Sequence, residues 1–268
     1  MSNPRADFNP IINRKPLKLP DNARVAVWFI INIEDWNFGS RMARSILPQP
    51  QGVNLIPDVT NFGWFEYGHR VGFWRMKEIL DRYSIKATIS LNAIVCRSYP
   101  QIVEESIKSG WEIMAHGYIQ RVLNLEEDER DIIRKAIELI KEKTGKPPRG
   151  WLGPGLAENF STPDVLAEEG IEYVGDWCND DQPYPLKVKN GTLYSIPYTL
   201  ELNDLPMYVV QHHRSAELYE RSRDHFDTLY REGATNARVM AIATHPFVTG
   251  VPHRIGYFEK IIEYLNSH

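Results

Sequence analysis

Short apolar runs recur along the chain, and their composition predicts strands. Residues 24–33 read RVAVWFIINI, a nearly continuous apolar run with several β-branched residues. Such a run is typical of a strand covered on both faces. Comparable shorter runs follow at residues 87–91, 111–115, 150–152, 171–174, 207–210 and 239–243. We expect each of these runs to form a strand.

Segments with helical periodicity separate these runs. The clearest one opens at Asn124, an N-cap residue type, with Glu127 three residues later and Gly145 at its end. Its apolar residues are spaced so that they lie on one face of a helix. Further helices are expected at residues 69–83, 99–109, 163–169, 215–232 and 256–266. Strands that alternate with helices predict an α/β fold with a mainly parallel sheet.

Two segments show neither the apolar runs of strands nor the periodicity of helices. Residues 1–22 hold four prolines and predict an irregular N-terminal arm, which leaves residues 23–268 as a single domain. Residues 37–68 combine aromatic residues with Gly and Pro over an unusually long stretch. Long loops in compact domains are usually functional or disordered, so this segment is interpreted as a lid or pocket wall, or as packing over the mouth of the domain.

Composition narrows the functional classes. A chain of 268 residues with 43% hydrophobic and 25% charged residues is long enough to bury one substantial core. Its formal charge of -4 predicts no nucleic-acid partner. The first ten residues lack the pattern of a secretory signal and no window reaches membrane-spanning length, so we expect a cytoplasmic protein without a membrane partner. The two cysteines, Cys96 and Cys178, exclude a disulfide framework.

Polar residues follow most of the predicted strands. In parallel barrels the carboxyl ends of the strands meet at one mouth, where chemistry takes place, so this repeated placement predicts a site. Simple strand-end roles remain as alternatives: a cap for the first residue, a satisfied rim histidine, or a turn before a proline. The residues are, in chain order, Asp35, Asn92, His116, the segment 153–155, Asp176 and His245.

Four segments resemble the polysaccharide deacetylases with the NodB homology domain. They are the sequences Ile-Glu-Asp at 33–35, GWEIMAHG at 110–117, TGKPP at 144–148 and the histidine His245. The resemblance implies an irregular (β/α)7-type barrel and a hydrolase. It also implies that Asp35 is a base and metal ligand, that His116 is a metal ligand, and that His245 is a general acid.

Two departures from that family pattern are chemically large. The family's second metal histidine stands four residues after the first, and here that position is Gln120. An arginine that orients the catalytic carboxylate is replaced by Leu152. A catalytic zinc normally needs about three protein ligands and a water, so Asp35 and His116 would form a weak or absent metal site. The resemblance therefore implies either no required cofactor or a weakly bound divalent metal such as zinc.

The departures favour a subgroup, the allantoinase-type enzymes and related cyclic imide hydrolases. This chain resembles them in His116-Gly117-Tyr118 and in residues 196–200. The expected activity is hydrolysis of a non-peptide carbon-nitrogen bond that opens a small cyclic amide, imide or ureide. A homo-oligomer is implied by the same resemblance. Metal-dependent deacetylation of an N-acetyl glycan or peptidoglycan, and a degenerate member that only binds, are the alternatives.

Each candidate residue has an expected role in this chemistry. Asp35 would be the general base on water, His116 would orient that water, and His245 would protonate the departing nitrogen. Backbone amides near Gly153 and Gly155 would stabilise the oxyanion. Further substrate contacts and apolar walls are expected from Glu34, Gln120, Trp151 and Trp177.

Overall fold

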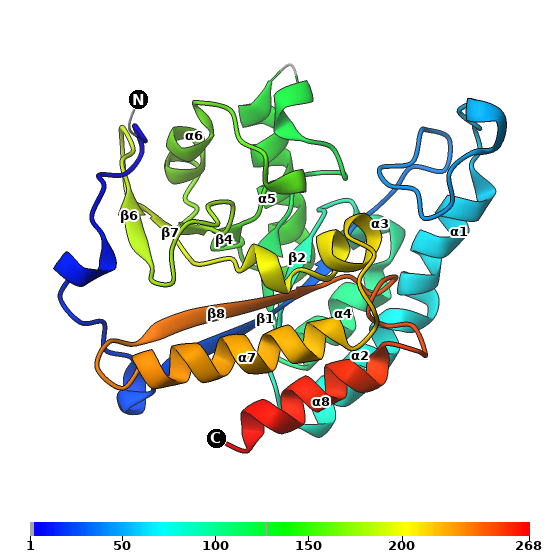
Figure 1. The fold of residues 1–268 in the computed structure, drawn as a ribbon. Coiled ribbons are helices and arrows are strands. Elements are labelled where there is room, and N and C mark those ends of the chain that lie inside the picture. Colours follow the sequence, from blue (N-terminus) through cyan, green and yellow to red (C-terminus); the bar gives the residue numbers. More distant parts are fainter. Residues whose placement is uncertain (1–2, 127) are drawn as a thin grey trace.

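The computed structural model describes residues 3–126 and 128–268, which form one curled eight-stranded sheet with helices around it (Figure 1). The strand order is β6-β7-β5-β4-β3-β2-β1-β8. The strands are β1 (Val25–Ile33), β2 (Thr88–Leu91), β3 (Glu112–Ala115), β4 (Gly150–Trp151), β5 (Tyr173–Val174), β6 (Tyr184–Leu186), β7 (Leu193–Ser195) and β8 (Arg238–Thr244).

Parallel pairing dominates this sheet. β1 pairs in parallel with β2 on one side and with β8 on the other, and the parallel pattern continues through β3, β4, β5 and β7. Within the described chain only β6 and β7 pair antiparallel. The expected mainly parallel α/β barrel is therefore confirmed.

Helices cover the outer face of the sheet: α7 lies alongside β8 and β1, and α8 packs against α7 and α2 (Figure 1). Their amphipathic patterns supply the apolar stripes that pack there. The helices are α1 (Val59–Tyr67), α2 (Phe73–Arg82), α3 (Val95–Ser98), α4 (Pro100–Lys108), α5 (Glu129–Thr144), α6 (Thr162–Glu168), α7 (Glu217–Glu232) and α8 (Ile255–Asn266).

The sheet separates two apolar cores. A large cluster fills the space between the sheet and the helices. A smaller cluster fills the barrel interior, because alternate residues of a strand point to opposite faces. The buried members of the interior cluster are Ile30, Met114, Leu152, Tyr198, Ala241 and Ala243.

Irregular segments close the barrel along the free edge of β8. The amide of Val239 donates to the carbonyl of Asp181 over 2.9 Å, and the amide of Ala241 donates to the hydroxyl of Thr199 over 3.1 Å. Asn203 forms a parallel bridge with Ala243. The barrel is irregular because side chains and loops, rather than a further strand, satisfy this edge.

Several predicted elements need correction. The apolar run at 207–210 is not a strand but lies in η8 (Leu205–Val210), a π-helical segment. The strand prediction was wrong because periodicity cannot distinguish a short apolar strand from a short buried helix. The expected loop at 37–68 contains α1. The helix expected from Asn124 begins at Glu129 with Asp128 as its N-cap. The expected capping residue Glu127 lies outside the described residues.

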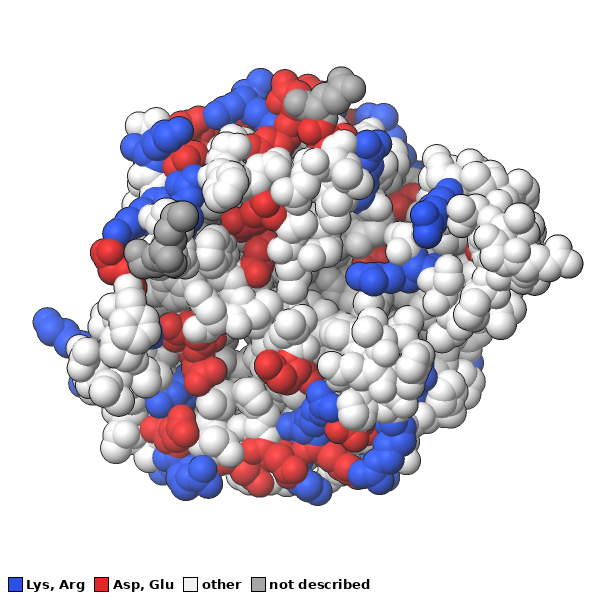
Figure 2. Space-filling model, turned by 45° about the horizontal axis from the view of Figure 1, so that its top comes forward, with Lys and Arg blue, Asp and Glu red and all other residues white. Residues whose placement is uncertain are grey.

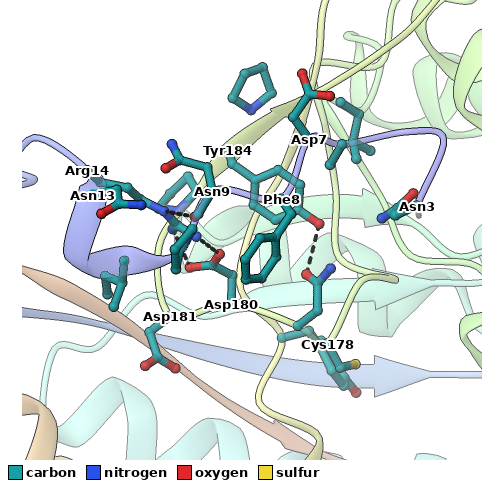
Figure 3. A pocket seen from close by; sticks show the side chains of 18 of the residues that line it. Asn3, Asp7, Phe8, Asn9, Asn13, Arg14, Cys178, Asp180, Asp181 and Tyr184 are labelled. Atoms are coloured by element: carbon teal, nitrogen blue, oxygen red, sulfur yellow. Dashed lines mark hydrogen bonds and ion pairs between the residues drawn. The ribbon is translucent and has the colours of Figure 1, made fainter. Parts of the chain in front are cut away.

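The N-terminal arm lies against the barrel wall and holds the turns η1 (Ile11–Asn13) and η2 (Pro20–Asn22). Arg5 pairs with Asp164 at 2.9 Å, and Arg14 pairs with Asp180 at 2.5 Å. Between the arm and residues 178–187 lies a pocket of about 1450 Å³, shown in Figure 3 with the Arg14–Asp180 pair across it. None of the predicted catalytic residues lines this pocket.

The surface in Figure 2 intermixes basic and acidic side chains without an extended region of one sign. Among the described residues, no helix combines the length and apolar character needed to cross a bilayer.

Candidate active site

Strand alternation brings three polar side chains to the barrel mouth. Trp28 and Ile30 of β1 belong to the interior cluster, so the two-residue repeat directs Glu34 to the same interior side. The same repeat leads from Met114 to His116 after β3. It leads from Ala241 and Ala243 to His245 after β8. All three polar residues are buried, with exposures of 3 to 5%. The carboxyl ends of the parallel strands therefore carry a buried polar cluster.

His245 is fixed by Asp204, which lies between the 3₁₀ turn η7 (Leu200–Leu202) and η8. Nδ1 of His245 donates to Oδ1 of Asp204 over 2.6 Å, and the His245 backbone amide donates to Oδ2 over 2.8 Å. The hydroxyl of Thr249 donates to the same Oδ2 over 2.6 Å. These contacts set the orientation of the imidazole and leave its Nε2 facing the mouth.

The Glu34 carboxylate lies next to that Nε2. Its Oε1 is 3.5 Å from Nε2 of His245 and accepts a 2.9 Å hydrogen bond from Nε2 of Gln120. Its Oε2 accepts a 2.6 Å bond from the indole N–H of Trp36. Burial raises the pKa of Glu34, but the nearby charge of His245 and the hydrogen bond from Trp36 together outweigh burial and hold that pKa below its usual value.

The two histidines of the mouth carry different charge states. Burial lowers the pKa of His245, yet the Asp204 and Glu34 carboxylates outweigh it and raise that pKa to about 9, so His245 is an imidazolium at neutral pH. Burial lowers the pKa of His116. Nδ1 of His116 must donate to the carbonyl of Leu152, 2.6 Å away, so Nε2 carries the free lone pair.

Asp35 is half-buried at the rim and is held through backbone and side chain. Its amide donates to Oδ1 of Asn92 over 2.8 Å, and its carboxylate accepts a hydrogen bond from the hydroxyl of Ser98. The Asn92 side-chain amide donates to the His116 carbonyl and to Oε1 of Gln120. Asn92 thus links the segment after β1 to the segment after β3.

The donor set does not fit a three-ligand zinc site. Gln120, at the family's third ligand position, has both ends of its amide engaged, Oε1 by Asn92 and Nε2 by Glu34. In residues 3–126 and 128–268, no group of three or more His, Cys, Asp or Glu side chains is arranged to hold a metal ion. Asp35 and His116 remain the two predicted ligands of a weakly bound divalent ion.

Two predicted contacts are corrected by the structure. Trp151 is fully buried between the sheet and the helices, because Leu152 takes the interior side of β4, so Trp151 does not form a pocket wall. The Gly153 amide donates to Oδ1 of Asp176 over 2.7 Å and is not free for an oxyanion. Gly155 has a positive φ of 70° and forms part of the tight turn after Gly153.

A second carboxyl pair borders the predicted wall residue Trp177. Asp176, Glu158 and Trp177 line a cavity of about 610 Å³, and the indole of Trp177 donates to Glu158 over 3.1 Å. Oδ2 of Asp176 is enclosed and has no hydrogen-bond partner among the described residues. Burial and the nearby Glu158 raise the pKa of Asp176 well above its usual value.

Sequence reasoning missed Asp204 and Ser98. It placed Asn92 at the mouth and named Glu34 as a substrate contact, but it did not predict which residues the two side chains bind. The two-residue repeat that runs from Trp28 through Ile30 to Glu34 could have predicted that Glu34 faces the barrel interior. Asp204 precedes a run that resembled a strand and contacts a residue 41 positions later, so no local pattern identifies it.

Comparison with known proteins gives three related results. The polysaccharide deacetylase family profile matches residues 63–174. A putative polysaccharide deacetylase of Schizosaccharomyces pombe is 29% identical, covering 92% of this chain and 86% of its own. The peptidoglycan deacetylase of Helicobacter pylori is 27% identical, covering 79% of this chain and 83% of its own.

Solved structures agree with that assignment. The crystal structure of PuuE allantoinase superposes with a TM-score of 0.86 at 28% identity, covering 98% of this chain and 93% of the other. The barrel, the order of the motifs and these relatives agree: residues 63–174 match the polysaccharide deacetylase family, most of the chain is similar to proteins of that superfamily, and the chain is a hydrolase acting on carbon-nitrogen bonds.

Proposed function

We propose that the protein hydrolyses a non-peptide carbon-nitrogen bond in a small cyclic amide, imide or ureide. The observation that carries this proposal is the use of Gln120. Its amide joins Asn92 to Glu34 where the family places a metal histidine, so the mouth carries a hydrogen-bonded relay in place of a third ligand. The likeness to PuuE allantoinase supports the same class of substrate.

Imides and ureides suit such a site. Their nitrogen shares its lone pair between two carbonyl groups, so the carbonyl carbon is more electrophilic and the leaving nitrogen is less basic. Less Lewis-acid assistance is required than for the acetamide of a sugar. A cationic general acid and a positioned base supply much of what remains.

The residues divide this work. Asp35 accepts a proton from the attacking water while the free Nε2 lone pair of His116 accepts a hydrogen bond from the same water. His245 donates its Nε2 proton to the departing nitrogen. The 3.5 Å separation of that Nε2 from Glu34 is longer than a good hydrogen bond, so the proton is not firmly held by the carboxylate.

The second candidate is deacetylation of an N-acetyl glycan, which the Helicobacter pylori relative favours. A screen of succinimide, hydantoin, allantoin and N-acetyl-glucosamine oligomers, each with and without EDTA, separates the two. We expect ring opening that persists after EDTA treatment. Turnover of the sugar oligomers alone, restored by zinc, would overturn the proposal. Ligand binding without turnover of any compound would support a degenerate member.

A homo-oligomer in the cytoplasm remains the expected state. Support for self-association comes from apolar side chains left exposed on the segment that leads into α1 and at the first residue of α1, among them Leu47, Ile56 and Val59. Analytical ultracentrifugation of wild type and of Leu47→Glu tests it. A wild-type monomer at micromolar concentration would contradict the proposed oligomer.

A further inference from the structure

A π-helical turn joins α1 to α2 directly behind the loop that carries His245. This turn, η4 (Gly68–Gly72), begins and ends with glycine. A Cβ added at Gly68 would lie 2.6 Å from the Phe247 nitrogen, and one added at Gly72 would lie 2.1 Å from the Pro246 oxygen. Only glycine permits this approach. π-Helical turns are rare and occur frequently at functional sites.

This close packing fixes η4, and with it His69, against the loop that carries His245. Its imidazole is 6% exposed and lies 4.4 Å from the Tyr99 ring and 4.8 Å from the Phe65 ring, measured between centroids. Phe65 stacks at 4.8 Å on Trp36, whose indole holds Glu34. Tyr99 directly follows Ser98, whose hydroxyl holds Asp35. His69 is therefore packed between the supports of the two carboxylates.

The imidazole of His69 has polar atoms without partners. Within the described residues neither ring nitrogen makes a hydrogen bond, and Nδ1 is fully enclosed. An unpaired polar group destabilises a protein, and because Nδ1 is enclosed, Nε2 is the nitrogen that a ligand can pair with. Burial lowers the pKa of His69 to about 4 despite the opposing charge of Glu34, so the ring is neutral and offers one N–H donor.

Cleavage of an amide needs such a donor. Negative charge develops on the carbonyl oxygen in the transition state and must be stabilised by hydrogen bonds. The expected donor, the Gly153 amide, is occupied by Asp176. A neutral imidazole has the donor strength for this task without acting as an acid, and the neutral histidine that polarises the substrate carbonyl in triosephosphate isomerase is the known example of this use.

We propose that His69 is a catalytic residue that donates an N–H hydrogen bond to the carbonyl oxygen of the bond being cleaved. This inference rests on the proposed amide-type hydrolysis. The water oxygen bonds to the carbonyl carbon, the carbonyl electron pair moves to oxygen, and the water proton goes to Asp35. The carbon-nitrogen bond then breaks with its electron pair on nitrogen, which takes the proton of His245. His69 transfers no proton.

The test compares His69→Phe and His69→Gln in the full-length protein. Phenylalanine keeps the aromatic packing but removes both nitrogens, so kcat should fall about 10² to 10³-fold with KM within a few-fold. Glutamine restores an N–H donor and should recover part of the lost kcat. Circular dichroism and thermal unfolding confirm that both variants fold.

A matched control is His225→Phe. His225 is another histidine with an unpartnered ring nitrogen, and it lines the separate pocket of about 1450 Å³. Its substitution should leave kcat unchanged. Folded His69→Phe with kcat within threefold of wild type, or His69→Gln no better than His69→Phe, would overturn the proposal.

The test does not depend on which amide is the substrate. If the wild type hydrolyses only N-acetyl-glucosamine oligomers, the proposed ring opening fails. The His69 comparison is then run on those oligomers, because an acetamide develops the same oxyanion. Loss of kcat there would support His69, and unchanged kcat would overturn it.

Discussion

Two carboxyl groups near the barrel mouth behave in opposite ways: Glu34, which is buried, and Asp176, which is half-buried with one enclosed oxygen. Burial opposes the charge of both. Yet Glu34 has a lowered pKa, because the nearby charge of His245 and the hydrogen bond from Trp36 together outweigh burial. Asp176 has a raised pKa, because burial is joined by the repulsion of Glu158 and opposed chiefly by the Gly153 amide. The partner of each carboxyl group, rather than its depth, decides its charge.

This difference in charge distinguishes the group around Glu34, to which we assign a catalytic role, from the pair around Asp176, to which we assign a structural role. The Asp204–His245–Glu34 group holds two anions around one cation and keeps a transferable proton at Nε2. The Asp176–Glu158 pair has no cation in the place where the family has an arginine, since Leu152 occupies that position in the interior core. Such a pair keeps its charge low by retaining a proton. Four predictions test this contrast, in order of decreasing expected effect.

Asp204→Asn should have the largest effect. The amide loses the negative charge that holds His245 as an imidazolium and that fixes its orientation, so kcat should fall about 10³ to 10⁴-fold. Steady-state kinetics with the substrate found in the screen measures it. Asp164→Asn is the matched control, since Asp164 is also buried but pairs with Arg5 on the N-terminal arm. Equal losses in both variants would contradict the special role of Asp204.

Glu34→Gln should reduce kcat about 10²-fold, a typical contribution of a group that tunes an acid-base residue. It removes one of the two anions that raise the pKa of His245. The alkaline limb of the kcat profile should therefore move to lower pH than in the wild type. An alkaline limb at an unchanged pH would show that Glu34 does not act on His245.

Wild-type kcat should fall about tenfold per pH unit above pH 9, because the general acid His245 then loses its proton. The stability of the fold should also decrease as the pH rises and His245 loses its proton. The folded pKa, about 9, is above the ordinary value of 6.5, so this group's stabilisation is full below pH 6.5 and is lost as pH rises to 9. Rates and unfolding temperatures measured from pH 6 to 10 test both. A rate unchanged to pH 10 would contradict His245 as the acid.

Asp176→Asn should have the smallest effect on activity, within threefold. Because the folded pKa of Asp176 is raised, its ionisation destabilises the fold increasingly as pH rises above the ordinary value of 3.8. The asparagine side chain keeps an oxygen that accepts the hydrogen bond from the Gly153 amide. Because it cannot ionise, it avoids the destabilising negative charge that Asp176 acquires at high pH. The unfolding temperature should rise by about 2 to 4 °C at pH 8, as roughly 1 kcal/mol produces in a chain of this size.

The same measurement near pH 4 is the control for Asp176→Asn, because both forms are then neutral and should unfold at similar temperatures. A variant destabilised at pH 8 but not near pH 4 would show that Asp176 is ionised in the folded protein and that its charge stabilises the fold. That result would remove the contrast with Glu34.

Much of the fold was predictable from local patterns. The runs at residues 24–33, 87–91 and 111–115 became β1, β2 and β3, because long or strongly apolar runs override local ambiguity. The run at 207–210 became a π-helical segment, and the short strands β6 and β7 were not predicted. Short elements depend on the contacts around them, so their own residues hold too little information.

For the site, the sequence by itself determined which polar residues end the strands, and the fold brings Glu34, Asp35, His116 and His245 to one mouth. Their chemical states were decided only by the tertiary structure. Asp204 reaches His245 across 41 residues, Gln120 joins Asn92 to Glu34, and the glycines of η4 bring the turn that carries His69 against the His245 loop. A charge state depends on burial and on neighbours in space, and neither is encoded in spacing along the chain.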